Sequence, residues 1–184
     1  PDLAGITVSR GGGMMPGVFI TADQPNDPSS QLVAQSSSLG SFAMEFVNGE
    51  SAKITASMAY SNSLPTAAIT NQDALEALLL SGGLTKEDGS NTALDYMAAD
   101  FNKNGAVTPH DALEILKYIQ GVGTLDAGWV FVDSAGDYSA INQSNVSYSE
   151  GLSTTNMLND FSVTMIGVLI GDVDDTYTGY LDIA

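Results

Sequence analysis

Short runs of alternating apolar and polar residues fill the first 64 positions of the chain. Gly, Pro, Asn and Asp separate these runs, and the same pattern returns after residue 125. Alternation with a period of two places every second side chain on one face, so runs bounded by turn residues predict antiparallel strands. The runs span residues 5–9, 17–21, 41–47, 52–60, 129–132 and 161–173.

Residues 69–121 have the spacing of helices instead. Apolar residues three and four positions apart form a stripe along one side of a helix. The two stripes are Ala74, Leu75, Leu78 and Leu79, and Ala112, Leu113, Leu116 and Ile119. The order of elements predicts a β-rich α+β fold, in which residues 1–64 and 125–184 form an antiparallel β-sandwich and residues 65–124 form a helical unit.

The charge balance narrows the possible partners. The 184 residues include 5 basic and 22 acidic side chains, which give a net charge of −17. Nucleic acids and anionic membranes are bound through Lys and Arg, so we expect neither as a partner. Since no run approaches the ~20 apolar residues of a membrane-spanning helix, we also expect no membrane insertion. Such an acidic chain favours cations, Ca²⁺ above all.

Cysteine and histidine usage limits the chemistry further. The chain has no cysteine and one histidine, which excludes disulfides, thiol catalysis, iron–sulfur clusters and multi-histidine metal centres. Acidity, few Lys and no Cys are typical of extracellular bacterial proteins. Because the chain begins at Pro1 without a basic leader region, we expect a processed chain or a fragment, secreted or held at the cell surface.

An internal repeat is the most specific signal in the chain. Residues 69–78 align with residues 107–116 at an offset of 38, and six of the ten positions are identical. Each copy has Thr followed three residues later by Asp, which is the arrangement of a capping box at the start of a helix. The repeat therefore predicts two helices that begin after Thr70 and Thr108.

The segment before the second copy has the ligand spacing of an EF-hand calcium loop. Side-chain oxygens stand at positions 1, 3 and 5, Gly105 at position 6 allows a sharp bend, and a carboxylate stands at position 12. Val107 at position 8 is expected to pin the loop to the core. With only two carboxylates, the loop predicts intermediate affinity. The predicted Ca²⁺ ligands are Asp100, Asn102, Asn104, the carbonyl of Ala106, and Asp111.

The first copy lacks such a loop. Its corresponding positions hold Asn62, Leu64 and Thr66, and Leu64 has no side-chain oxygen. We therefore expect this site to be lost, with Asp73 acting as a helix cap rather than as a metal ligand.

Three carboxylates near the C-terminus have two interpretations. Asp172, Asp174 and Asp175 could form a second cation site, or they could charge a strand end against edge-to-edge pairing. The run from Asp133 to Gly136 departs from the Asp-Ser/Thr-Gly motif of aspartic proteases by an inserted Ala, and no second copy exists. We expect no enzymatic activity.

The loop and the helix that follows it, from Asp100 to Ile119, resemble a dockerin, in which paired loop–helix repeats each bind Ca²⁺. The flanking segments 40–42 and 52–57 are similar to Ig-like β-sandwich modules of the carboxypeptidase-regulatory or collagen-adhesin B type. Such modules precede dockerin-like repeats in large secreted bacterial surface proteins. The resemblance implies a collagen-adhesin-B-like sandwich that bears a two-repeat dockerin-like unit.

The function implied by these observations is non-catalytic. We expect a Ca²⁺-stabilised extracellular module that acts by association with a partner protein or with itself, as in an adhesin, a surface layer or a filament. Self-association could include polymer formation or strand exchange. The alternative is an accessory module of a secreted hydrolase whose catalytic domain lies outside this chain.

Overall fold

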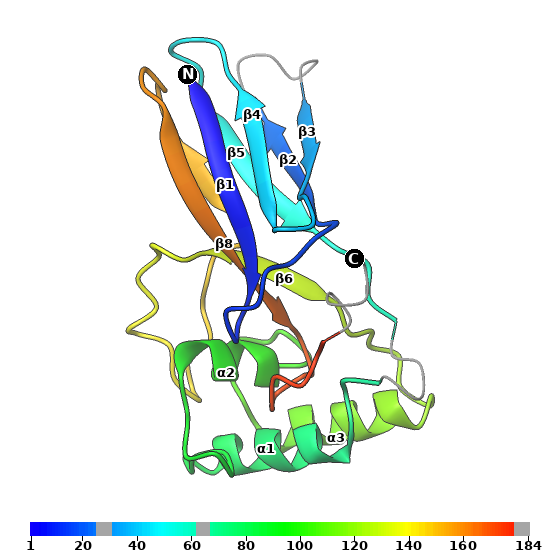
Figure 1. The fold of residues 1–184 in the computed structure, drawn as a ribbon. Coiled ribbons are helices and arrows are strands. Elements are labelled where there is room, and N and C mark those ends of the chain that lie inside the picture. The colour runs from blue at the N-terminus through cyan, green and yellow to red at the C-terminus, as the bar shows by residue number, and fades with distance from the viewer. Residues whose placement is uncertain (25–30, 62–66, 179–184) are drawn as a thin grey trace.

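Two four-stranded sheets and three helices make up the part of the chain that the structure, a computed structural model, describes: residues 1–24, 31–61 and 67–178 (Figure 1). The strand order is β4-β1-β8-β6 in the first sheet and β3-β2-β5-β7 in the second. The strands are β1 (Asp2–Ser9), β2 (Phe19–Asp23), β3 (Leu32–Gln35), β4 (Ser41–Glu45), β5 (Ala52–Ser57), β6 (Trp129–Asp133), β7 (Leu152–Thr154) and β8 (Phe161–Leu169).

Strand direction differs from the prediction at the centre of the first sheet. There β1 pairs with β8 in the parallel sense, from Leu3 opposite Phe161 to Ser9 opposite Gly167. The other strand pairs of the two sheets are antiparallel. The expectation of a purely antiparallel sandwich is therefore wrong for this pair. The two strands come from opposite ends of the chain, so no short hairpin forces them to run in opposite directions.

The two sheets share one hydrophobic core. Leu3 and Phe131 from the first sheet lie in the same fully buried cluster as Ile20 and Ile54 from the second. On β4, residues between the buried positions face outward, so buried and exposed positions alternate along this strand. Burial of each such side chain contributes about 1.5–3 kcal/mol relative to exposure. The period-two pattern thus places the core between the sheets.

A second core joins the first sheet to the helices. Val130, Val132 and Val168 on β6 and β8 belong to a buried cluster with Ala77 and Ile115 from the helical unit. The helices lie together at the lower end of the sheets in Figure 1. They are α1 (Asn71–Ser81), α2 (Ala93–Ala99) and α3 (Pro109–Ile119). Strands β6 and β8 therefore contribute to both cores.

Several elements were not predicted from the sequence. Strands β3 and β7 have four and three residues, and α2 has seven, so each is too short to give a clear period. The strand predicted over 161–173 ends earlier, at Leu169. Gly171 has φ of +99°, a left-handed conformation that favours glycine and turns the chain away from the sheet.

The apolar stripes of α1 and α3 do not face the core along their whole width. Ala74 and Ala112 are buried, whereas the leucines next to them point into solvent. We call these leucines the leucine surface. Their exposed fractions are 42% for Leu75, 48% for Leu78, 46% for Leu113 and 40% for Leu116.

Candidate metal centre

The loop between α2 and α3 brings the two predicted carboxylate ligands into one buried place. Asp100 caps the C-terminal end of α2, and Asp111 lies in the first turn of α3. Their exposed fractions are only 3% and 0%. Acidic side chains are rarely buried so completely unless a partner compensates the charge.

Asp100 organises the first half of the loop. Its Oδ1 accepts a hydrogen bond from the N–H of Asn104 at 3.0 Å, and its Oδ2 accepts one from the N–H of Gly105 at 2.9 Å. Gly105 has φ of +89° and Lys103 has φ of +54°, so the backbone turns sharply around the carboxylate. The predicted bend at position 6 is confirmed.

Asp111 closes the loop from the other side. Its Oδ1 accepts a hydrogen bond from the N–H of Asn102 at 3.2 Å. Its Oδ2 accepts one from the N–H of Thr108 at 2.9 Å and one from the Thr108 hydroxyl at 3.0 Å. One carboxylate therefore caps α3 and holds the loop, and the capping box predicted at Thr108 is confirmed.

The two predicted asparagine ligands point their carbonyl oxygens along the loop. The Asn102 Oδ1 accepts from the N–H of Asn104 at 3.0 Å, and the Asn104 Oδ1 accepts from the N–H of Ala106 at 3.1 Å. These contacts keep both oxygens in the loop. The predicted ligands thus belong to one hydrogen-bonded turn, and metal binding by them stays a prediction.

A second segment fixes the loop from outside. Val107 is 3% exposed, and its N–H donates to the carbonyl of Gln143 at 2.7 Å. In return, the N–H of Val146 donates to the carbonyl of Gly105 at 2.7 Å. The expectation that Val107 anchors the loop is confirmed. Its partner segment, around residues 141–146, was not foreseen, because nothing in that run of residues indicates a pairing with the loop.

The loop concentrates negative charge. Burial raises the pKa of Asp100 above its usual range, and the nearby Asp111 carboxylate raises it further, although the N–H groups of Gly105 and Asn104 oppose this. The electrostatic cost of two adjacent buried carboxylates falls when a cation binds between them.

A second acidic group lies at the junction of α1 with the end of β8. One carboxylate oxygen from each of Asp73, Asp172 and Asp174 can be chosen so that all three lie within 4.8 Å of one another, close enough to hold a metal ion. Burial and the Asp174 charge raise the pKa of Asp73 to about 7, and burial raises that of Asp172 to about 6. We call these residues the aspartate triad.

The triad differs from the group proposed on sequence grounds. Asp175 lies outside it and forms an ion pair with the Nε of Arg10 at 3.5 Å. Asp73 takes its place. The predicted capping role of Asp73 is confirmed, because its Oδ2 accepts from the N–H of Thr70 at 2.7 Å. Asn62, Leu64 and Thr66, the expected remnant of a first loop, lie outside the described residues.

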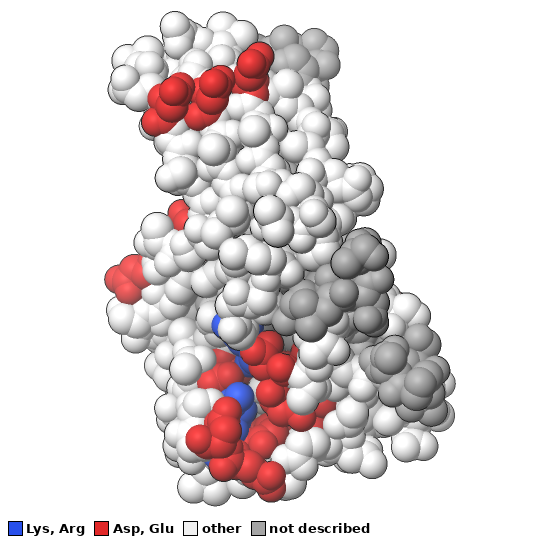
Figure 2. Space-filling view, viewed as in Figure 1, with Lys and Arg blue, Asp and Glu red and all other residues white. Residues whose placement is uncertain are grey.

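Buried cations surround the C-terminal part of this junction. Arg10 and Lys86 both pair with Asp95, at 2.9 and 3.0 Å. Arg10 also donates to the carbonyls of Asp172 and Val173, and Lys86 donates to that of Val173. Figure 2 shows acidic side chains gathered over this lower part of the molecule, with a few basic atoms among them.

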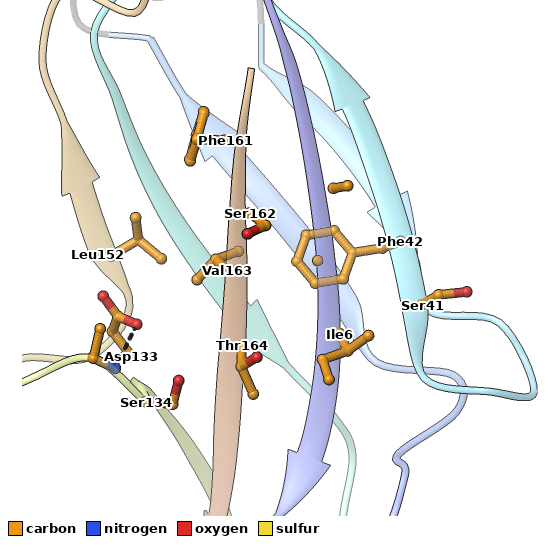
Figure 3. A pocket seen from close by; sticks show the side chains of 13 residues that line it. Ile6, Ser41, Phe42, Asp133, Ser134, Leu152, Phe161, Ser162, Val163 and Thr164 are labelled. Atoms are coloured by element: carbon orange, nitrogen blue, oxygen red, sulfur yellow. Dashed lines mark hydrogen bonds between the residues drawn. The ribbon is translucent and has the colours of Figure 1, made fainter. Parts of the chain in front are cut away.

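A hollow on the first sheet offers a contrasting candidate (Figure 3). It has a volume of about 700 Å³, and its lining includes Phe42, Phe161 and Thr164. Among its lining residues the one ionisable side chain is Asp133, whose Oδ1 accepts from the N–H of Ala135. General acid–base chemistry needs positioned proton donors and acceptors, and a single carboxylate supplies no complementary pair. The acidic loops are therefore the stronger candidate site.

No family model, curated protein or solved structure matches the chain. Within the described residues, no helix has the length and apolar character needed to cross a membrane. The dockerin-like and collagen-adhesin-B-like resemblances therefore stay predictions.

Proposed function

We propose that this chain is a non-catalytic, calcium-stabilised extracellular module that acts by protein–protein association. The observation that supports this most directly is the loop from Asp100 to Asp111. It holds two buried carboxylates and two amide oxygens in one loop that runs into the first turn of α3. Ca²⁺ takes six to eight oxygen ligands, and oxygen-rich loops with this spacing bind it.

Calcium binding would couple the loop to the stability of the fold. An ion that binds only the folded chain adds RT ln(1 + [L]/Kd) to the free energy of unfolding. Extracellular modules bind Ca²⁺ with Kd values of roughly 0.1–1 mM. We expect an affinity in this range here, because only two of the loop's ligands carry a charge. The module would then be fully folded where Ca²⁺ is at millimolar levels.

The leucine surface is the feature that favours association. A hollow of about 350 Å³ runs between α1 and α3, and the four exposed leucines line it together with Ala74 and Ala112. Contiguous exposed apolar residues on a soluble protein commonly mark an interface. The repeat offset of 38 relates Leu75 to Leu113 and Leu78 to Leu116, so each helix presents the same pair.

The leucine surface can be tested with paired substitutions. Replacing Leu75 and Leu113 by Asp is expected to abolish concentration-dependent association in about 5 mM CaCl₂, because two charges would enter the apolar contact. The free energy of unfolding should fall by about 1–3 kcal/mol, since each side chain is only about half exposed and Asp is a weaker helix former than Leu. Analytical ultracentrifugation and thermal unfolding measure these two quantities.

Leu39→Asp is the matched control. Leu39 is 73% exposed and lies in the turn before β4, far along the chain from α1 and α3. This variant should associate like the wild type. Equal association by the Leu75/Leu113 variant would contradict the assignment of the surface. Monomers throughout the wild-type series would exclude self-association and leave a foreign partner protein.

A further inference from the structure

The C-terminal loop after β8 repeats the contacts of the loop at 100–111. Asp172 Oδ1 accepts from the N–H of Thr176 at 2.9 Å, and its Oδ2 accepts from the N–H of Tyr177 at 3.1 Å. These donors lie four and five residues after the carboxylate, as Asn104 and Gly105 do after Asp100. The sequences have the same spacing of polar residues: residues 172–176 read Asp-x-Asp-x-Thr, and residues 100–104 read Asp-x-Asn-x-Asn.

Asp73 occupies the place in this second loop that Asp111 has in the first. Its Oδ1 accepts from the N–H of Asp174 at 3.1 Å, while Asp111 Oδ1 accepts from the N–H of Asn102 at 3.2 Å. In both cases the other carboxylate oxygen caps the helix. The residue after Asp174 has φ of +60°, close to the +54° of Lys103. The correspondence ends at Tyr177, which lacks the positive φ of Gly105.

One atom points independently to a missing ligand. The Oδ1 of Asp174 is buried from solvent and has no hydrogen-bond partner among the described residues. An unpaired buried carboxylate oxygen is costly, and the usual compensation is a positive charge or a metal ion. Neither Arg10 nor Lys86 contacts this oxygen, although the Arg10 charge favours the ionised form of Asp172. Their polar contacts are with backbone carbonyls and with Asp95, Asp175 and Asp88.

We propose that the aspartate triad binds a second Ca²⁺ in a discontinuous site. Asp172 and Asp174 come from the loop after β8, and Asp73 comes from the first turn of α1, about 100 residues earlier. Three carboxylates supply the hard oxygen ligands that Ca²⁺ prefers, and backbone carbonyls or water would complete its six to eight ligands. The proposal rests on its own residues and does not require the loop at 100–111 to bind a metal.

The position of this site gives it a structural role. The sequence before α1 has Leu64 where the repeat would need a ligand, and the C-terminal loop supplies carboxylates to α1 instead. The ion would bridge α1 and the chain that leaves β8. It would therefore tie the helical unit to the first sheet, whose strands β6 and β8 contribute to both cores.

Calcium stoichiometry tests the proposal. Isothermal titration of CaCl₂ into chelator-stripped protein should give two ions per chain for the wild type, one for Asp174→Ala and one for Asp100→Ala. The matched control is Asp175→Asn, which removes one charge from the same loop but outside the triad. Asn tolerates the positive φ at position 175, so this variant should fold and still bind two ions. In chelator, Asp174→Ala should melt no lower than the wild type, because it removes a buried carboxylate oxygen that has no hydrogen-bond partner among the described residues.

The outcomes separate the two sites. One ion bound by the wild type and retained in Asp174→Ala would overturn the triad site and leave the loop at 100–111 intact. Two ions bound by Asp174→Ala would overturn it as well. One ion in the wild type that is lost in Asp174→Ala but kept in Asp100→Ala would support the triad site and contradict the first loop.

Discussion

Replacement of Asp111 by alanine is expected to lower the free energy of unfolding by about 4 kcal/mol in the presence of Ca²⁺. The side chain is fully buried and accepts three hydrogen bonds, one from Asn102 and two from Thr108. Its loss removes the cap of α3, leaves partly buried donors of Asn102 and Thr108 unpaired and deletes a proposed Ca²⁺ ligand. Urea unfolding followed by circular dichroism, in Ca²⁺ and in chelator, measures the effect.

Two further variants separate the causes. Asp137→Ala also removes a carboxylate that accepts a backbone N–H, that of Ser139, but it lies in an exposed turn and should cost less than about 0.5 kcal/mol. Asp111→Asn keeps the shape of the side chain and one of its two acceptor oxygens, so it should be milder than alanine in chelator and still lose most of the response to Ca²⁺. If Asp111→Ala proved as mild as Asp137→Ala, the assignment of Asp111 as the closing residue of the loop would be wrong.

Stability without Ca²⁺ is expected to fall as the pH rises from about 5 to about 8. Burial and neighbouring acids raise the pKa of Asp73 to about 7, and burial raises that of Asp172 to about 6. In the unfolded chain both titrate near pH 4. Carboxyl groups with raised pKa values bind more protons in the folded state than in the unfolded state. Their contribution to the free energy of unfolding is therefore full below about pH 4, and it is lost as the pH rises through their folded-state pKa values.

Between about pH 5 and about pH 8, the free energy of unfolding should fall by an amount on the order of 3 kcal/mol, since one pKa unit corresponds to about 1.4 kcal/mol. Urea unfolding in chelator at a series of pH values measures it. Asp73→Asn should flatten the profile because it removes the group with the larger shift. Saturating Ca²⁺ should also flatten it, since a bound ion stabilises the ionised carboxylates. A wild-type stability that rises from pH 5 to pH 8 in chelator would contradict this account.

Local sequence patterns were sufficient for the elements whose stabilising contacts are local. The repeat placed the starts of α1 and α3 because Thr and Asp three residues apart form a capping box within one turn. The bend of the loop at 100–111 was predictable for the same reason, since Gly105 and the carboxylates that hold the turn lie within twelve residues. Strands β3 and β7 are too short to show a period, and the parallel pairing of β1 with β8 depends on contacts between the two ends of the chain.

The aspartate triad shows where sequence reasoning stopped. The acidic residues near the C-terminus were recognised, but the third member was taken to be their neighbour Asp175. The structure supplies Asp73 instead, through hydrogen bonds between residues 100 positions apart. One signal was present in the sequence: Asp172, Asp174 and Thr176 have the spacing of Asp100, Asn102 and Asn104. In the structure, the carboxylate that completes this partial loop comes from Asp73, which no local spacing indicates.

The most direct test of calcium dependence is thermal unfolding of the wild type and Asp100→Ala, each in chelator and in about 5 mM CaCl₂. For the wild type, this Ca²⁺ concentration is about 5–50 times the expected Kd, so binding should add about 1–2.3 kcal/mol to the free energy of unfolding and raise Tm by roughly 2–9 °C. Asp100→Ala should lose a large part of this rise, while Glu45→Gln, an exposed acid on β4, should keep it. Equal Tm values for the wild type with and without Ca²⁺ would contradict the proposed function.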